Sequence, residues 1–166
     1  MSNSPNFETI TNAGSFWRAI GVRAIGPAIV TATGSSGRAG FLALSTAHLS
    51  ADPPMMMVSI GLQTSALQTI LQGKHFALNF LSQGDQDLAS EFGGKGQLKG
   101  ADRFTTREWT TLVSGAPILP DAVGVIDCQL EEAIERYGSI IAIGRVLAYA
   151  SNSKKRPLVS YGGTYL

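Results

Sequence analysis

Small hydroxyl-bearing and small apolar side chains gather in two stretches of this sequence, Thr31-Ala32-Thr33 and Ser45-Thr46-Ala47. Each stretch follows a short apolar run, which predicts a place at the end of a β-strand. Hydroxyls and backbone N–H groups beside apolar surface suit a flat heteroaromatic ligand, because its edge needs hydrogen bonds and its faces need apolar contacts. The two stretches therefore fit either a site for such a ring or strand edges with solvated hydroxyls.

A second polar group, formed by Gln63, Thr64 and Ser65, stands at the predicted start of a helix. The first turn of a helix has free N–H groups and the positive end of the helix dipole, so it can bind a phosphate. Thr64 or Ser65 can instead cap the helix, and the two roles can coexist. Lys95 and Arg103 could add positive charge from a later glycine-rich loop, although Lys95 alone also fits a solvated loop.

Other catalytic signatures fail on their spacing. Gly34-Ser35-Ser36-Gly37 lacks the glycine that a nucleophile elbow needs at position 38, which is Arg. The run around Lys95 is no phosphate loop, because Gly96 follows it instead of Ser or Thr. His48 and His75 have no carboxylate or cysteine partner at a metal-ligand spacing, so we expect no metal site.

The elements that must position these residues are mostly strands, because the apolar runs are short and separated by turn residues. A glycine-rich surface loop over 93–103 and a turn near Tyr137-Gly138 complete the pattern. The predicted strands are 28–33, 40–45, 55–61, 75–81, 122–134 and 140–150, the last two forming a hairpin, and the predicted helices are 13–23, 64–73 and 85–92.

Composition limits the class of protein. The chain has 166 residues, 44% of them hydrophobic, and a net charge of +1. This predicts one domain over residues 13–166 after a flexible segment over 1–12, with neither nucleic acid nor a membrane as partner. The single Cys128, the absence of a targeting segment and the polar start favour the cytoplasm. The run Lys154-Lys155-Arg156 has no interleaved aromatics and fits a solvated turn.

Several motifs, taken in order, resemble one known family. The run GRAGFLALSTAHLSADPPMMMVSI, from Gly37 to Ile60, resembles the glycine-phenylalanine and Asp-Pro-Pro pattern of the short-chain flavin reductases. These are the small components of two-component flavin monooxygenases. The resemblance covers roughly residues 16–165, and its further pieces are KHFALNFLS, Gln86, Phe92, Trp109, Gly115–Leu119, Cys128, Ile143–Val146, and Pro157-Leu158 to Tyr165.

The resemblance implies a mainly β fold, an FMN-binding split β-barrel with a few short flanking helices, working as a homodimer with the flavin near the subunit interface. It favours flavin contacts at the two hydroxyl-rich stretches, and the helix start at Gln63, Thr64 and Ser65 is then the expected site of the flavin phosphate. Arg103, followed by Phe104, matches a recurrent Arg-Phe of the family. The apolar Met55, Met56 and Met57 agree with a surface that a second subunit covers.

The implied activity is hydride transfer from NADH or NADPH to FMN, with FAD possible, and delivery of reduced flavin to a partner monooxygenase. Two alternatives remain open. One is a reductase that retains FMN and passes single electrons to a docked acceptor such as a cobalt corrinoid, and the other is a flavin carrier or sensor without turnover.

One stretch departs from the family pattern. Before the Ile143-Gly144-Arg145-Val146 strand, family members commonly carry Gly-Asp-His, whose histidine lies near the nicotinamide and the flavin. Here the stretch is Tyr137-Gly138-Ser139, which places Ser139 at the histidine's position. We therefore assign no catalytic side chain with a copied role.

Overall fold

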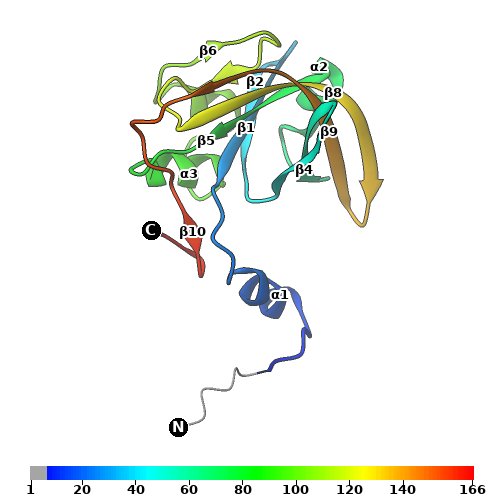
Figure 1. The fold of residues 1–166 in the computed structure, drawn as a ribbon, viewed down its shortest axis with the longest axis vertical. Coiled ribbons are helices and arrows are strands. Elements are labelled where there is room, and N and C mark those ends of the chain that lie inside the picture. Colours follow the sequence, from blue (N-terminus) through cyan, green and yellow to red (C-terminus); the bar gives the residue numbers. More distant parts are fainter. Residues whose placement is uncertain (1–6) are drawn as a thin grey trace.

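The computed structural model describes residues 7–166 and has a mainly β fold. Figure 1 shows a strongly curved sheet with short helices around it and a first helix that stands away from the sheet. The helices are α1 (Ala13–Ile20), α2 (Leu67–Gly73), α3 (Gln86–Phe92) and the 3-10 helix η1 (Gly100–Phe104). The strands are β1 (Ala28–Gly34), β2 (Gly37–Ala43), β3 (Thr46–Ala51), β4 (Pro54–Gly61), β5 (His75–Phe80), β6 (Thr110–Thr111), β7 (Pro117–Ile118), β8 (Gly124–Arg136), β9 (Ser139–Ser151), β10 (Ser160–Tyr161) and β11 (Thr164–Tyr165).

The main sheet closes on itself at one end. Its seven strands are antiparallel and follow the order β2-β1-β5-β8-β9-β4-β3. β2 and β3 are the two edges of this order, yet only Leu44 and Ser45 separate them in the chain. The sheet therefore curls until its edges meet at Leu44-Ser45, which gives a partly closed barrel. The expected mainly β fold with short flanking helices is confirmed.

Apolar side chains fill both faces of the central strands. In β1, Val30 points into the barrel core and Ile29 into a second core outside it, and in β5 Phe76 and Ala77 divide in the same way. Successive residues of a strand point to opposite faces, so a continuous apolar run is what a doubly covered strand requires. α2 packs on the inner core, and α3 and η1 pack on the outer one.

Gly144 in β9 lets two core side chains approach the backbone. A Cβ atom there would lie 2.6 Å from Cζ of Phe76 and 2.9 Å from Cβ of Cys128. Cys128 is fully buried, and this burial, with the carboxylate of Asp127 as a second cause, raises the pKa of its thiol to about 12. The thiol is therefore a protonated core group at neutral pH.

The structure corrects the boundaries of two predicted helices. The first helix ends at Ile20 instead of Arg23, because the N–H of Gly21 already closes onto Trp17 and Arg18 carbonyls. The second helix begins at Leu67, and neither Thr64 nor Ser65 caps it. The N–H of Thr64 instead donates to the carbonyl of Gly61 in a turn that follows β4.

Three further segments differ from expectation. Residues 46–51 form β3, which the sequence did not indicate, and it pairs with β4 up to Pro54. The loop after α3 contains η1, and β10 and β11 form a short hairpin near the carboxyl end.

The amino-terminal segment and the helices test two further expectations. The predicted flexible segment over residues 1–12 lies partly outside the described residues, and Asn12 within it is the N-cap of α1. None of the helices in residues 7–166 has the length and apolar character needed to cross a bilayer.

Candidate functional site

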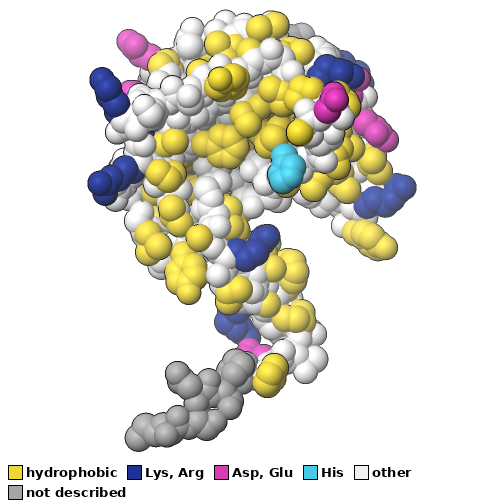
Figure 2. Space-filling view, viewed as in Figure 1, with side chains coloured by type: hydrophobic (Ala, Val, Ile, Leu, Met, Phe, Trp, Pro, Cys, Tyr) yellow, Lys and Arg dark blue, Asp and Glu magenta, His cyan; other side chains and the backbone are white. Residues whose placement is uncertain are grey.

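A cavity of about 1040 Å³ lies between α1 and the closed end of the sheet. Figure 2 shows the hollow between the body of the molecule and the protruding helix, with hydrophobic side chains on much of its surface. Its walls come from five separate parts of the chain. They are Phe16, Trp17, Ile20, Gly21, Arg23 and Ile25 near the first helix, Phe41–Ser45 from β2, Ser59, Gly61, Thr64 and Ser139 from the β4 and β9 ends, and Ser160–Gly163 near the carboxyl end.

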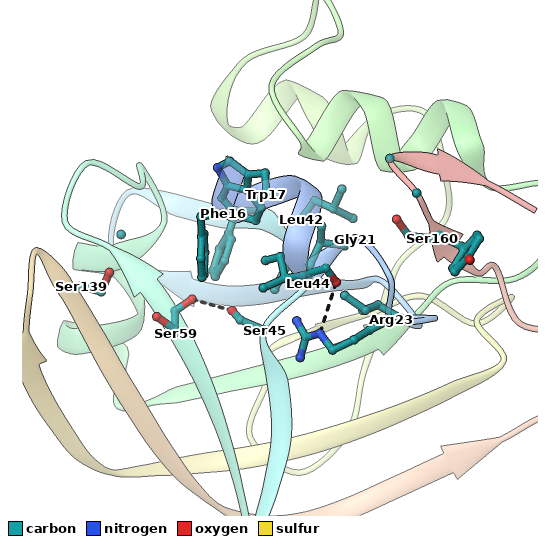
Figure 3. A pocket seen from close by; sticks show the side chains of 18 of the residues that line it. Phe16, Trp17, Gly21, Arg23, Leu42, Leu44, Ser45, Ser59, Ser139 and Ser160 are labelled. Atoms are coloured by element: carbon teal, nitrogen blue, oxygen red, sulfur yellow. Dashed lines mark hydrogen bonds between the residues drawn. The ribbon is translucent and has the colours of Figure 1, made fainter. Parts of the chain in front are cut away.

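Two aromatic side chains of α1 form one wall of this cavity. Phe16 and Trp17 contact each other edge to face, with ring centroids 5.8 Å apart, and are 48% and 60% exposed. In Figure 3 both rings lie across from Ser45 and Ser59. A capping box stabilises the start of α1. The side chain of Asn12 accepts from the N–H of Ser15, and the hydroxyl of Ser15 accepts from the N–H of Asn12.

The opposite wall is polar and built from strand ends. The hydroxyl of Ser45 donates to the carbonyl oxygen of Ser59 at 3.1 Å, which joins the end of β2 to β4. Leu42 and Leu44, beside Ser45, add apolar surface. An aromatic wall facing small hydroxyls is the environment that a flat ring with a polar edge requires.

A turn that includes unpaired backbone N–H groups adjoins the cavity at Thr64. Thr64 lines the cavity, and Gln63 and Ser65 flank it in the exposed turn after β4. Within the described part of the chain, the N–H groups of Gln63, Ser65 and Ala66 have no hydrogen-bond acceptor. Several free N–H groups in one turn can bind an anion even though α2 starts later than the sequence indicates.

Ser139 lines the same cavity. It is half-buried and pairs with Gly61 at the end of the β4–β9 ladder. The sequence therefore located three residues of the cavity wall: Ser45, Thr64 and Ser139.

The first hydroxyl-rich stretch lies elsewhere. Thr31 is fully buried, and its hydroxyl donates to the carbonyl of Pro117 at 2.6 Å. Ala32 belongs to the barrel core. Thr33 donates its N–H to Nε2 of His75 and its hydroxyl to the carbonyl of Gly115. β1 lies between β2 and β5, so its small polar side chains are used to bind neighbouring segments inside the protein.

His75 has a structural role that fixes its tautomer. Its Nε2 accepts the N–H of Thr33 at 3.2 Å, so Nδ1 carries the hydrogen and donates to the carbonyl of Gly73 at 2.7 Å. This agrees with the interpretation of His75 as an ordinary structural histidine.

Four other predicted contacts are outside the cavity wall. Thr46 and Ala47 are the first residues of β3 and pair with Val58 and Met57. Lys95 is exposed on the loop after α3. Arg103 is buried in η1, where its Nε donates to the carbonyl of Leu98 at 3.2 Å. Its position follows from its neighbour Phe104, which packs with Phe92 and Trp109 in the outer core.

The site residues predicted from the sequence did not include the cavity residues near the chain ends. Among the described lining residues Arg23 carries the one formal charge, and its Nε donates to the carbonyl of Ile20 at 3.4 Å. Phe16, Trp17 and the segment Ser160–Gly163 reach the cavity only through the fold. A periodic helix pattern identified the first helix but not the surface that its aromatics face.

Comparison with known proteins decides the family. Residues 23–166 match the family model described as a flavin reductase like domain. The chain belongs to the flavin reductase family. Among curated relatives of this flavin reductase domain, the FMN reductase (NADH) RutF of Bradyrhizobium diazoefficiens is 32% identical over 137 residues, which cover 82% of this chain and 75% of that protein.

Solved structures of flavin reductases share the fold. A putative flavin reductase from Haemophilus somnus superposes with a TM-score of 0.89 at 26% identity and covers 94% of this chain and 99% of that chain. The NADH:FAD oxidoreductase SgcE6 of Streptomyces globisporus gives a TM-score of 0.88 at 25% identity, and each chain is covered to 98%.

The cavity fits the ligand that the family name implies. A flavin has a flat ring system with a polar edge and, in FMN, a terminal phosphate. The aromatic wall, the Ser45-Ser59 wall and the free N–H groups beside Thr64 match these three parts. Among residues 7–166, no group of three or more histidine, cysteine or acidic side chains is placed to bind a metal ion.

Proposed function

We propose that this protein is an NADH-dependent flavin reductase that binds FMN in the cavity between α1 and the sheet. The observation that carries the proposal is the cavity itself, with Phe16 and Trp17 facing Ser45 and Ser59 and with free backbone donors in the turn at Thr64. The name of the relative from Bradyrhizobium diazoefficiens, FMN reductase (NADH), supports the choice of both substrates. FAD is the second flavin to test, in view of the name of the Streptomyces globisporus protein.

The residues of this chain bind, orient and shield. FMN held in this cavity would supply the hydride acceptor and NADH the hydride, so the reaction would need no strong acid or base from the protein. Phe16 and Trp17 cover one face of the site and exclude water from it. Ser45 holds the strand ends together, and Ser139 provides a small hydroxyl where the family commonly has histidine.

The flavin phosphate is assigned to the turn at Gln63, Thr64 and Ser65. Its N–H groups are free for an anion, and Thr64 brings its side chain to the cavity wall. Lys95 and Arg103 have no part in this assignment, because neither lines the cavity: Lys95 is exposed on the loop after α3 and Arg103 is buried in η1.

Reduced flavin is proposed to leave this site for a partner monooxygenase. The wall formed by α1 is thin, since of the eight residues of this helix only Ser15 is buried. A second copy of the chain is proposed to cover the exposed apolar face of α1 and to complete the site as a homodimer. We place the protein in the cytoplasm.

One experiment tests the reductase against its alternatives. Addition of NADH to the FMN-loaded protein without oxygen should remove the visible flavin absorbance within seconds. A carrier or sensor would keep its colour. Repeating the reaction with excess free FMN distinguishes release from retention: many equivalents of FMN are reduced if flavin exchanges, and only the bound equivalent if it is retained for a one-electron acceptor.

A further inference from the structure

The β8–β9 hairpin ends in a two-residue turn with an aromatic residue at an unfavourable position. Tyr137 has φ +48° and Gly138 has φ +76°, so both central residues are left-handed. Turns of this kind strongly favour Asn-Gly, Asp-Gly or Gly-Gly, because a bulky side chain is strained at positive φ. The side chain of Tyr137 is also completely exposed, so no packing within the described chain compensates for the strain. Strain that brings no packing points to a function.

The turn is fixed at the mouth of the cavity. The N–H of Leu62 donates to the carbonyl of Gly138 at 3.2 Å, and Ser139, the next residue, pairs with Gly61 and lines the cavity. The turn is thereby attached to the segment whose free N–H groups we assign to the flavin phosphate. Figures 1 and 2 show that the hairpin tip and α1 project from the same side of the sheet and flank the hollow.

The residue before Tyr137 in the chain carries a positive charge. Arg136 is exposed, and its guanidinium donates to the carbonyl of Glu135 at 2.6 Å. Among the described residues no carboxylate lies within ion-pair distance of it. The nearest acidic residue in sequence is Glu135, which precedes Arg136 in β8. Consecutive residues of the hairpin tip therefore carry an exposed aromatic ring and a guanidinium with no ion-pair partner among the described residues.

We propose that Tyr137 and Arg136 form the outer binding site for the pyridine dinucleotide, a further specificity-determining pair beyond the flavin cavity. The ring of Tyr137 stacks on a planar base of the dinucleotide, and Arg136 faces its pyrophosphate. The inference rests on the proposed reductase function, because it names the site of its electron donor. It also gives the departure Tyr137-Gly138-Ser139 a role: the aromatic contact comes from the turn, where the family commonly has glycine.

The test compares variants that keep the turn but change the ring. Tyr137→Asn tolerates positive φ and removes the ring, whereas Tyr137→Phe keeps the ring and removes the hydroxyl. Tyr149→Asn is the matched control, because Tyr149 is an exposed tyrosine of β9 that does not line the cavity. We expect Tyr137→Asn to raise the KM for NADH about tenfold, as for loss of one stacked base. Tyr137→Phe and Tyr149→Asn should stay near wild type, and the Kd for FMN should not change in any of the three.

Two further measurements complete the test. Arg136→Gln should raise the KM for NADH at low salt, and the difference from wild type should shrink as salt screens the charge. Tyr137→Gly should raise Tm by about 2–4 °C by relieving strain while it raises KM, which shows that the loss is not unfolding. An unchanged KM for NADH in Tyr137→Asn overturns the inference. Dissociation of a dimer by Tyr137→Asn also overturns it, because the ring would then belong to a subunit contact. A wild-type protein that oxidises no NADH would instead refute the proposed function, and this inference with it.

Discussion

The hydroxyl of Ser45 donates to the carbonyl oxygen of Ser59 across the point where the two edges of the sheet meet. Ser45 leads from β2 into β3, and Ser59 lies in β4. This hydrogen bond fixes the polar wall of the cavity opposite Phe16 and Trp17. The geometry of that wall therefore depends on one side chain at the bend where the chain passes from β2 into β3.

Replacing this hydroxyl should weaken flavin binding. Ser45→Ala removes one neutral hydrogen bond and a polar contact of the wall, so the Kd for FMN should rise about 2- to 10-fold. Thr46→Val is the control, because Thr46 is the next residue, loses its hydroxyl at constant volume and does not line the cavity. Titration followed by quenching of flavin fluorescence measures both. Equal losses in the two variants would show that the strand, not the hydroxyl, determines affinity.

The indole ring of Trp17 should contribute to the affinity for FMN. Trp17→Ala removes apolar surface from the cavity and should raise the Kd for FMN about tenfold, whereas Trp17→Phe should retain most of the affinity. Val22→Ala is the control, since Val22 is exposed close by and does not line the cavity. Isothermal titration calorimetry of the three variants decides the point. Wild-type affinity in Trp17→Ala would remove α1 from the flavin site.

The turn after β4 should distinguish FMN from riboflavin, which lacks the phosphate. Each charge-assisted hydrogen bond contributes about 1.5–3 kcal/mol, so FMN should bind about tenfold or more tightly. Ser65→Asp adds a like charge and should narrow this ratio without weakening riboflavin binding.

Two checks belong to this comparison. The melting temperature of Ser65→Asp should not fall, because Ser65 does not cap α2. Ser153→Asp, in the exposed turn after β9, adds the same net charge beyond the end of β9 opposite to Ser139, which pairs with Gly61, and should leave the ratio unchanged. If Ser65→Asp leaves the ratio of FMN to riboflavin affinity unchanged, the phosphate site must be sought elsewhere in the cavity, first at Arg23.

A methyl group at position 144 should destabilise the core. In Gly144→Ala the new Cβ would lie 2.6 Å from Phe76 and 2.9 Å from Cys128, so side chains or backbone must shift. We expect a loss of about 1–3 kcal/mol in the free energy of unfolding, measured by urea denaturation. Gly26→Ala is the control, because no atom lies within 4 Å of the added methyl group. Equal stability of the two variants would mean that β9 can move away from β5 and β8 at little cost.

The buried thiol should make stability fall at alkaline pH. Burial raises the pKa of Cys128 from 9.0 to about 12, so above pH 9 the unfolded chain loses a proton that the folded chain keeps. Stability is then lost progressively as pH rises from about 9 to 12, by at most about 1.4 kcal/mol per pH unit. Cys128→Ala should flatten this slope. Burial also raises the pKa of Tyr165, so part of the slope should persist in the variant. Identical slopes in both proteins would show that the thiol titrates normally.

Local patterns predicted most of the sheet because its strands are buried on both faces or alternate regularly. The runs at Ala28, His75 and Gly124 became β1, β5 and β8 within a few residues. β3 was missed for a physical reason: it is an edge strand with exposed His48 and Leu49, and the proline pair after it suggested a loop. Thr64 and Ser65 resemble a helix cap in sequence, but the N–H of Thr64 is used by the turn at Gly61.

The sequence predicted only those cavity residues that lie at the ends of recognisable strands and turns. Ser45, Thr64 and Ser139 lie at ends of elements that the sequence marks, whereas Phe16, Trp17 and Arg23 reach the cavity by the path of the chain before β1. Thr31 and Thr33 have the residue types of a ligand site, yet their hydroxyls bind carbonyls of the segment before β8. Residue type alone does not distinguish an internal hydrogen-bond partner from a ligand contact, because both need the same donors.

The enclosed position of Cys128 also bears on oxidative damage. Reduced flavin that meets dioxygen yields hydrogen peroxide, and a protein that releases reduced flavin is the first to be exposed to it. Peroxide attacks the thiolate, and accessibility limits the attack. The chain has no other cysteine, and this one is buried and protonated at neutral pH. Under the proposed function, the protein would therefore offer no reactive sulfhydryl to peroxide formed from the flavin that it releases.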